Sequence, residues 1–132
     1  MTLFVDASAL VAMIAGEDEG PGFADVLTAG SDIVWSAMVC WETISALRRS
    51  HGFDHAHARR AVETVAEHAE FRLVEIGQNE LPVALQAYQT FGRGSGHPAK
   101  LNMGDCFAYA CAKTNGAALL YKGGDFALTD LK

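Results

Sequence analysis

The chain has 132 residues and a net charge of −6, with half of its residues hydrophobic and a fifth charged. This length and composition predict a single soluble domain, residues 1–132, whose core needs no disulfide staples. The acidic balance argues against a protein that grips nucleic acid with a broad basic surface. An acidic site that holds divalent cations can still bind a phosphate.

The cysteines and the amino terminus predict the compartment. Cys40, Cys106 and Cys111 are odd in number, lie among apolar residues and lack a Cys-x-x-Cys spacing, so we expect buried, reduced thiols. The first predicted strand follows Met1 and Thr2 directly, which leaves no room for a signal peptide. No apolar run is long enough to cross a bilayer. Together these features predict a cytoplasmic protein without a membrane segment.

The first strand is an apolar run that ends at an acidic residue. Residues 3–5 form an uninterrupted apolar segment, as in a strand buried on both faces. We expect Asp6 to end this strand and Ser8 to cap a helix that begins at Ala9. Because ligands of parallel α/β sheets bind beyond the carboxyl ends of the strands, Asp6 is predicted at the functional edge of the sheet.

The rest of the chain alternates strands and helices. The first helix covers residues 9–14, and after a turn at 16–22 Pro21 starts a short helix that ends near Leu27. The other predicted strands are residues 33–35, 73–76 and 118–121. The other predicted helices run from a Ser36 cap to about Arg49, from an Asp54 cap to about Glu70, and over residues 80–91 and 103–114. This alternation predicts a three-layer α/β/α domain with a mostly parallel central sheet of four or five strands.

Four acidic residues from separate segments are predicted to reach the same edge of this sheet. Asp6 follows the first strand, and Asp125 lies in a glycine-rich turn after the last one. Glu42 lies in a helix that is apolar almost all the way round, and Asp105 lies in the first turn of another helix. Each alone also suits an ordinary role as a turn residue, a salt-bridge partner or a charge at a helix start. Gly104, next to Asp105, hints that another group approaches the backbone closely.

Together the four carboxylates predict a metal site. Two carboxylates about 5 Å apart repel by roughly 3 kcal/mol at an effective dielectric of about 20. A cluster of four therefore needs protons or cations to compensate it. Mg²⁺ or Mn²⁺ is the natural counter-ion of an all-oxygen site, and either ion supports hydrolysis of a phosphodiester bond.

Several stretches of the sequence match a known family. They are residues 4–10, 41–43, 97–110, 119–126 and 129–131. In these stretches the chain resembles the PIN-domain ribonucleases and, within them, the VapC toxins of bacterial toxin–antitoxin pairs. The resemblance covers the whole chain. It implies a PIN-like fold, a metal-dependent endoribonuclease, a homodimer and a VapB-like antitoxin that keeps the enzyme silent.

The resemblance also implies which residues form the site. Asp6, Glu42, Asp105 and Asp125 fall on the family's acidic quartet, which implies catalytic and metal-binding roles for all four. Ser8 falls on a small polar position that often holds a metal-bound water. Asn102 and Asp130 fall on polar positions near the site whose roles vary. We expect water activated by the metal to attack the scissile phosphorus of RNA and to leave a 5′-phosphate and a 3′-hydroxyl.

Basic residues are needed to hold the RNA. Candidates are Arg48 and Arg49 at the end of the Glu42 helix, Arg93 and Lys100 in the glycine-rich loop at 92–100, Lys122 after the last strand, and the pair Arg59-Arg60.

Two other functions remain open from the sequence. His51, His55 and His57 lie close together, and a histidine pair can cleave RNA without a metal and leave a 2′,3′-cyclic phosphate. The second alternative is a receiver-like phosphoacceptor module. Such a module has acids at its strand ends and a lysine late in the chain, and Lys122 would be that lysine. Against it, Asp6 has no acidic neighbour, and the predicted middle strand offers only Glu75.

Overall fold

The strands are short apolar segments that pair in parallel. The computed structural model describes residues 1–29 and 32–131, with strands β1 (Thr2–Val5), β2 (Asp32–Trp35), β3 (Arg72–Leu73) and β4 (Ala118–Leu120). Their order is β3-β2-β1-β4, and each pair is parallel. In the central strand, Phe4 lies opposite Val34 on one side and Leu119 on the other. Phe4 is fully buried, as expected for a strand covered on both faces.

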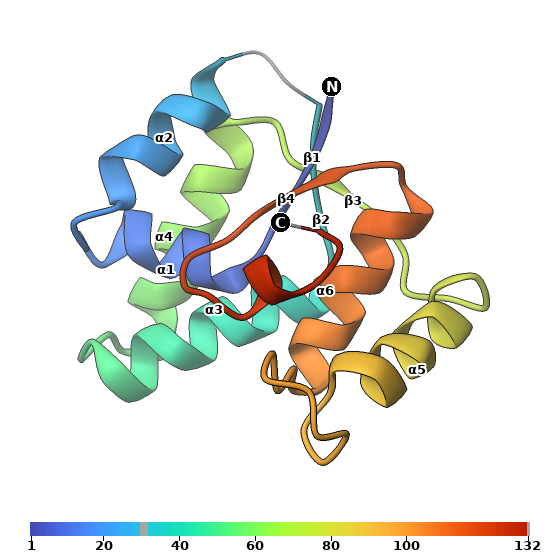
Figure 1. The fold of residues 1–132 in the computed structure, drawn as a ribbon. Coiled ribbons are helices and arrows are strands. Elements are labelled where there is room, and N and C mark those ends of the chain that lie inside the picture. The colour runs from blue at the N-terminus through green and yellow to red at the C-terminus, as the bar shows by residue number, and fades with distance from the viewer. Residues whose placement is uncertain (30–31, 132) are drawn as a thin grey trace.

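The helices form the two outer layers. They are α1 (Ala7–Ile14), α2 (Gly20–Thr28), α3 (Ala37–Ser50), α4 (His55–His68), α5 (Glu80–Phe91) and α6 (Met103–Thr114), and the 3₁₀ helix η1 (Phe126–Leu128) follows β4. Figure 1 shows α5 and α6 on one side of the sheet and α1, α2 and α4 on the other, with α3 beneath the carboxyl ends of the strands. The predicted three-layer α/β architecture is confirmed, with four strands.

Helix α3 is held firmly at this end of the sheet. Ser36 caps it, because the Ser36 side chain accepts a hydrogen bond of 3.2 Å from the backbone N–H of Val39. Leu47 packs with Ala58 and Val62 of α4 in a small second core, in which all three side chains are fully buried. The helix that carries Glu42 is therefore a fixed element of the site's framework.

Two details of the predicted elements are wrong. The first helix is not capped by Ser8: it begins at Ala7, and its N-cap is Asp6, whose carboxylate accepts the Ser8 N–H at 3.0 Å. Both residue types are good caps, and Asp6 comes first in the chain. The strand predicted at 73–76 is only Arg72–Leu73, because its neighbour β2 ends at Trp35, whose carbonyl accepts the Val74 N–H at 2.8 Å.

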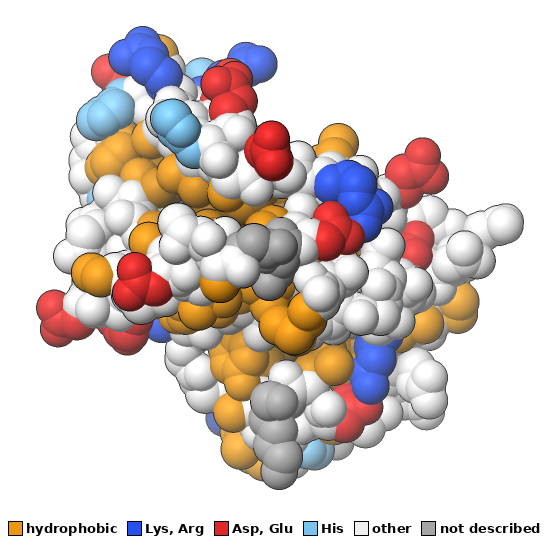
Figure 2. Space-filling view, turned by 90° about the horizontal axis from the view of Figure 1, so that it is seen from above, with side chains coloured by type: hydrophobic (Ala, Val, Ile, Leu, Met, Phe, Trp, Pro, Cys, Tyr) orange, Lys and Arg blue, Asp and Glu red, His pale blue; other side chains and the backbone are white. Residues whose placement is uncertain are grey.

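The cysteines and the surface charges complete the description of the fold. All three cysteines are free; Cys106 and Cys111 are buried as predicted, and Cys40 is only partly buried. Seen from above, acidic and basic side chains border one another around the hydrophobic ones (Figure 2). Arg72 and Asp32 form an ion pair of 2.8 Å between β3 and β2. None of the described helices has the length and apolar character that crossing a membrane requires.

Candidate active site

A pocket of about 320 Å³ at the carboxyl end of the sheet gathers acidic side chains from three elements. Asp6 reaches it from the end of β1, Glu42 from α3 and Asp105 from the first turn of α6. Helix α3 packs against both α1 and α6, which brings these segments together. Three of the four predicted acids therefore lie in one pocket, although they are far apart in the sequence.

Asp6 is the most deeply placed of these acids. Its exposed fraction is 6%, and its carboxylate accepts hydrogen bonds from the Ser8 N–H at 3.0 Å and the Ser8 hydroxyl at 2.6 Å. Burial raises the pKa of Asp6, and the bonds from Ser8 oppose that rise. The Ser8 hydroxyl also accepts the backbone N–H of Lys122 at 2.9 Å. Ser8 therefore orients Asp6 and ties it to the segment after β4.

Glu42 lies against the backbone of α6. A Cβ placed on Gly104 would come 2.7 Å from the Glu42 carboxyl carbon and would overlap its Oε2 atom. The close approach that Gly104 predicted is therefore the approach of Glu42, which only a glycine permits. Burial, followed by the charges of Asp6 and Asp105, raises the pKa of Glu42 to about 7.

Asp105 and Asn102 form a reciprocal cap at the start of α6. The Asn102 side chain accepts the Asp105 N–H at 2.8 Å, and the Asp105 Oδ2 accepts the Asn102 N–H at 3.0 Å. Burial raises the pKa of Asp105 to about 6; the Asn102 N–H lowers it, and the charges of Asp6 and Asp125 raise it. Asn102 therefore orients Asp105 and leaves its second carboxylate oxygen available for a ligand.

Asp125, the fourth acid of the predicted quartet, and Asp130, predicted as a polar residue near the site, lie outside this pocket. Asp125 is exposed and lines a neighbouring pocket of about 730 Å³. It is still close enough for its charge to raise the pKa of Asp105. Asp130 accepts hydrogen bonds from the Tyr109 hydroxyl at 2.7 Å and from Lys113 at 2.6 Å. Asp130 thus ties the end of the chain to α6.

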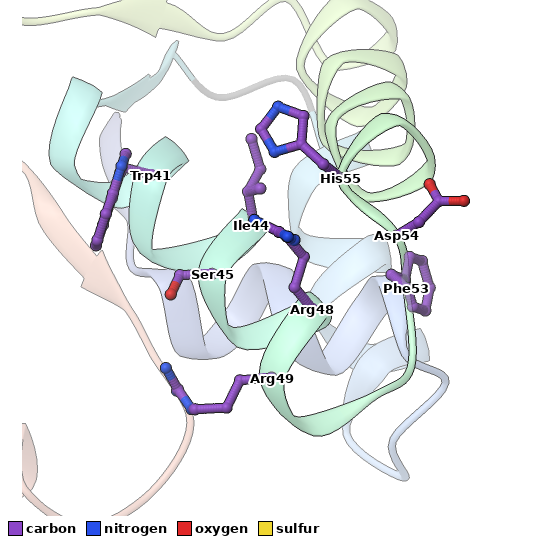
Figure 3. Close-up of a pocket in the computed structure, with 8 residues that line it drawn as sticks. All are labelled: Trp41, Ile44, Ser45, Arg48, Arg49, Phe53, Asp54 and His55. Atoms are coloured by element: carbon purple, nitrogen blue, oxygen red, sulfur yellow. The ribbon is translucent and has the colours of Figure 1, made fainter.

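Of the predicted basic residues, four lie beside the acids, whereas Lys122 is engaged elsewhere and Arg59 and Arg60 lie on α4, where Arg59 pairs with Glu63. Arg49 lines the acidic pocket, and Arg48 lines a groove next to it (Figure 3). Arg93 and Lys100 line the pocket of Asp125. Lys122 differs, because its ammonium is engaged by Glu17 at 2.7 Å and by Glu19 at 3.6 Å.

Two side chains at the site were not among the predicted residues. Trp41 lines the acidic pocket and the groove of Figure 3, and His97 lines the pocket of Asp125. The His97 Nδ1 atom accepts the Ala99 N–H at 3.0 Å, and its ring meets the Phe91 ring edge-on at 4.9 Å. The position of Trp41 next to Glu42 was a usable signal, whereas nothing in the sequence singled out His97.

An apolar groove of about 490 Å³ lies between α5 and α6. Leu85 and Tyr88 of α5 and Met103 of α6 border it, with exposed fractions of 57%, 56% and 69%. Leu81, 49% exposed, continues the stripe along α5. The spacing of residues 81, 85 and 88 along one helix face is the signal that the sequence offered for it.

The donor set fits a divalent metal ion that keeps part of its water shell. Within residues 1–29 and 32–131, no group of three or more His, Cys, Asp or Glu side chains is arranged to hold a metal ion. Mg²⁺ is usually bound through only one or two carboxylates, with waters and substrate phosphates as its other ligands. In the same ranges, Asp6, Glu42 and Asp105 form no ion pair. Burial is the largest cause of the raised pKa of each of these three acids, and the charges of the neighbouring carboxylates add to it for Glu42 and Asp105.

The three histidines considered for metal-independent RNA cleavage, His51, His55 and His57, each contact a different group. His51 lies 3.7 Å from Glu17, and the His57 ring stacks on Phe53 at 4.2 Å. His55 lines the groove beside α3 (Figure 3). The ion pairs of Lys122 with Glu17 and Glu19 likewise differ from the lysine–aspartate arrangement that a receiver-like site requires.

Comparisons with known proteins give matches over nearly the whole chain. A model of the PIN domain matches residues 3–132. The chain is 34% identical over 130 residues to ribonuclease VapC42 of Mycobacterium tuberculosis, covering 98% of this chain and 97% of the relative. It is 36% identical over 134 residues to ribonuclease VapC28 of the same species (98% and 96% covered). It is 37% identical over 142 residues to a VapC ribonuclease of Rhizobium meliloti (97% and 98% covered).

A solved structure has the same fold. The crystal structure of Mycobacterium tuberculosis VapC20, described as a toxin that cleaves the sarcin-ricin loop, superposes with a TM-score of 0.75. The match covers 98% of this chain and 96% of VapC20, at 20% sequence identity. At that level of identity, the comparison establishes the shared architecture.

Proposed function

The chain belongs to the VapC ribonucleases of the PIN-domain family, which are toxin endoribonucleases, and we propose that its activity depends on Mg²⁺ or Mn²⁺. In this proposal one or two of Asp6, Glu42 and Asp105 bind the ion directly, the others bind it through water, and Asp125 adds its negative charge beside them. The observation that carries it is the meeting of three acids from distant segments in one pocket, none of them in an ion pair among the described residues.

The side chains of the pocket have distinct tasks in this mechanism. When bound, the divalent ion supplies a Lewis acid that activates water and offsets charge on the phosphate. Ser8 fixes the Asp6 carboxylate through two hydrogen bonds, and Asn102 fixes Asp105. Glu42, with a pKa of about 7, carries a proton part of the time near neutral pH and releases it when a cation binds.

The basic residues beside the pocket are proposed to hold the RNA backbone. Arg49 on one side and Arg93 with Lys100 on the other border the acids, so phosphates on both sides of the scissile bond would meet a positive charge. Lys122 contributes less to this role because Glu17 engages it. The proposal places the enzyme in the cytoplasm, where RNA is available and thiols stay reduced.

Two protein partners belong to the proposal. One is a VapB-like antitoxin, the usual partner of a VapC toxin, which keeps the enzyme silent. The other is a second copy of the chain. The apolar face of α5 and α6, with Leu85, Tyr88 and Met103 at its rim, is proposed as the dimer interface, because a symmetric contact would cover it on both copies.

The test is cleavage of a total RNA pool by the purified chain. A chelator should abolish cleavage, and Mn²⁺ or Mg²⁺ should restore it. Asp6→Asn should lower the rate on the order of 100-fold or more. Asp25→Asn, a change at an exposed aspartate of α2, is the matched control and should cleave normally. Cleavage that resists the chelator, or a 2′,3′-cyclic phosphate product, would contradict metal-dependent hydrolysis.

A further inference from the structure

Trp41 is a large aromatic side chain that the fold leaves in solvent. Its exposed fraction is 72%. The other tryptophan, Trp35, is partly buried and meets the Phe71 ring edge-on at 5.2 Å. Exposing an indole gives up the free energy of burying it, and large exposed apolar groups beside a pocket often mark a binding surface. Packing in the hydrophobic core therefore does not explain why a tryptophan occupies position 41.

The position of Trp41 connects it directly to the acidic pocket. Trp41, Ser45 and Arg49 lie four residues apart on one face of α3, and all three line the pocket of Asp6 and Glu42. Figure 3 shows the indole standing out from α3, with Ser45 and Arg49 further along the same helix. Trp41 also lines the groove on its other side. The indole is thus a ridge between the acidic pocket and that groove.

The charges around this ridge favour a polyanion. The chain is acidic overall, with a net charge of −6. Within residues 1–29 and 32–131, ion pairs engage Arg59, Arg72, Lys113 and Lys122, whereas none involves Arg48, Arg49, Arg60, Arg93 or Lys100. Two of these cations, Arg48 and Arg49, line the groove of Trp41 together with a single carboxylate, that of Asp54. A segment that places phosphates on the arginines and a planar ring on the indole matches both features.

We propose that Trp41 stacks on a nucleobase of single-stranded RNA next to the scissile phosphate, while Arg49 contacts the adjoining backbone phosphate. The inference rests on the proposed nuclease function and adds a residue that binds substrate. Stacking on an aromatic ring accepts every base, because every base has a π-face. A stacked base would fix the register of the RNA over the acids, and the arginine would hold its backbone.

Tryptophan emission tests binding apart from cleavage. With a chelator present to keep the RNA intact, short single-stranded polyadenylate is titrated into the protein. We expect saturable quenching that Trp41→Phe removes and Trp35→Phe retains. Should Trp35→Phe fail to fold, the anisotropy of labelled polyadenylate gives the same comparison. Trp41→Ala should then bind about 5- to 100-fold more weakly, and Trp41→Tyr should bind nearly as the wild type does.

Steady-state cleavage gives the second readout. Trp41→Ala should raise KM for RNA by a similar factor with kcat within a few-fold, and Trp41→Tyr should restore KM. Leu73→Ala removes another exposed apolar side chain, on β3, and should change neither constant. The proposal is overturned if polyadenylate leaves the emission unchanged, or if Trp41→Ala keeps its affinity for RNA and loses only dimer formation or antitoxin binding. Failure of the nuclease function would appear differently, as wild-type protein that binds RNA and does not cleave it.

Discussion

Glu42 occupies an unfavourable position for an ionised carboxylate. Burial and the charges of Asp6 and Asp105 raise its pKa from 4.5 to about 7. Between these two values, the folded protein binds the Glu42 proton more tightly than the unfolded chain does. The metal-free protein therefore loses stability as the pH rises through this window, and the loss is complete above it.

Replacing Glu42 with glutamine should stabilise the metal-free protein only at higher pH. With a chelator present, we expect Glu42→Gln to raise Tm by roughly 3–6 °C at about pH 8 and to leave it unchanged at about pH 4, since the penalty exists only when Glu42 is ionised. Thermal unfolding followed by circular dichroism measures this. Glu67→Gln, at an exposed position of α4, is the matched control. An equal gain at both pH values would show that charge is not the cause.

Gly104 and Glu42 should behave as a coupled pair. Alanine normally favours a helix over glycine by about 1 kcal/mol, but here its Cβ would overlap the Glu42 carboxylate. We expect Gly104→Ala to lower cleavage on the order of 10-fold or more without raising stability. In a Glu42→Ala background, the same change should become stabilising. Chemical denaturation of the four proteins should give a coupling of roughly 1–3 kcal/mol, and additive effects would contradict the contact.

The start of α6 links the stability of that helix to the geometry of the acidic pocket. Asp105 is both a pocket acid and half of the cap of its own helix, because its Oδ2 atom holds the Asn102 N–H. The geometry of the helix terminus therefore sets the direction of the carboxylate. By contrast, Asn79 occupies the N-cap position of α5 and makes no side-chain cap hydrogen bond.

This contrast gives a matched pair of variants. Asn102→Ala should lower stability by about 1 kcal/mol and Tm by roughly 3–5 °C, because the Asp105 N–H loses its acceptor. Cleavage should fall several-fold as α6 frays near Asp105. Asn102→Ser should recover most of both losses, since serine is also a good cap. Asn79→Ala should change little, and an equal loss there would argue that capping is not what Asn102 contributes.

The sequence predicted the long elements well because their signals are local. The bounds of α5 and α6 are confirmed, and the Asn102 N-cap marks the start of α6. The cap of α1 was assigned wrongly, because Asp6 and Ser8 both suit that position. The length of β3 depends on where its neighbour β2 ends, and a local pattern does not contain that information. For the same reason, the sequence suggested a close approach at Gly104 but could not say that Glu42 makes it.

For the whole molecule, the apolar face of α5 and α6 should determine whether two copies of the chain form a dimer. Leu85→Glu places a charge in the apolar stripe, where a partner surface would have to desolvate it. Because Leu85 is already 57% exposed, the monomer should keep its fold. We expect a dimer for the wild type and a monomer for Leu85→Glu in sedimentation velocity runs. Gln86→Glu, at an exposed position of α5 turned away from this stripe, should remain dimeric. A dimeric Leu85→Glu protein would exclude this face.

The strand order also decides when the pocket comes into existence. The Asp6 N–H donates to the Leu120 carbonyl at 2.9 Å, and the Lys122 N–H donates to the Ser8 hydroxyl, so the first acid of the chain is fixed by residues near its end. A growing polypeptide still on the ribosome has Asp6 and Glu42 early but lacks the strand that secures them. The acidic pocket is therefore completed only after residues 118–122 have been synthesised and β4 has paired with β1.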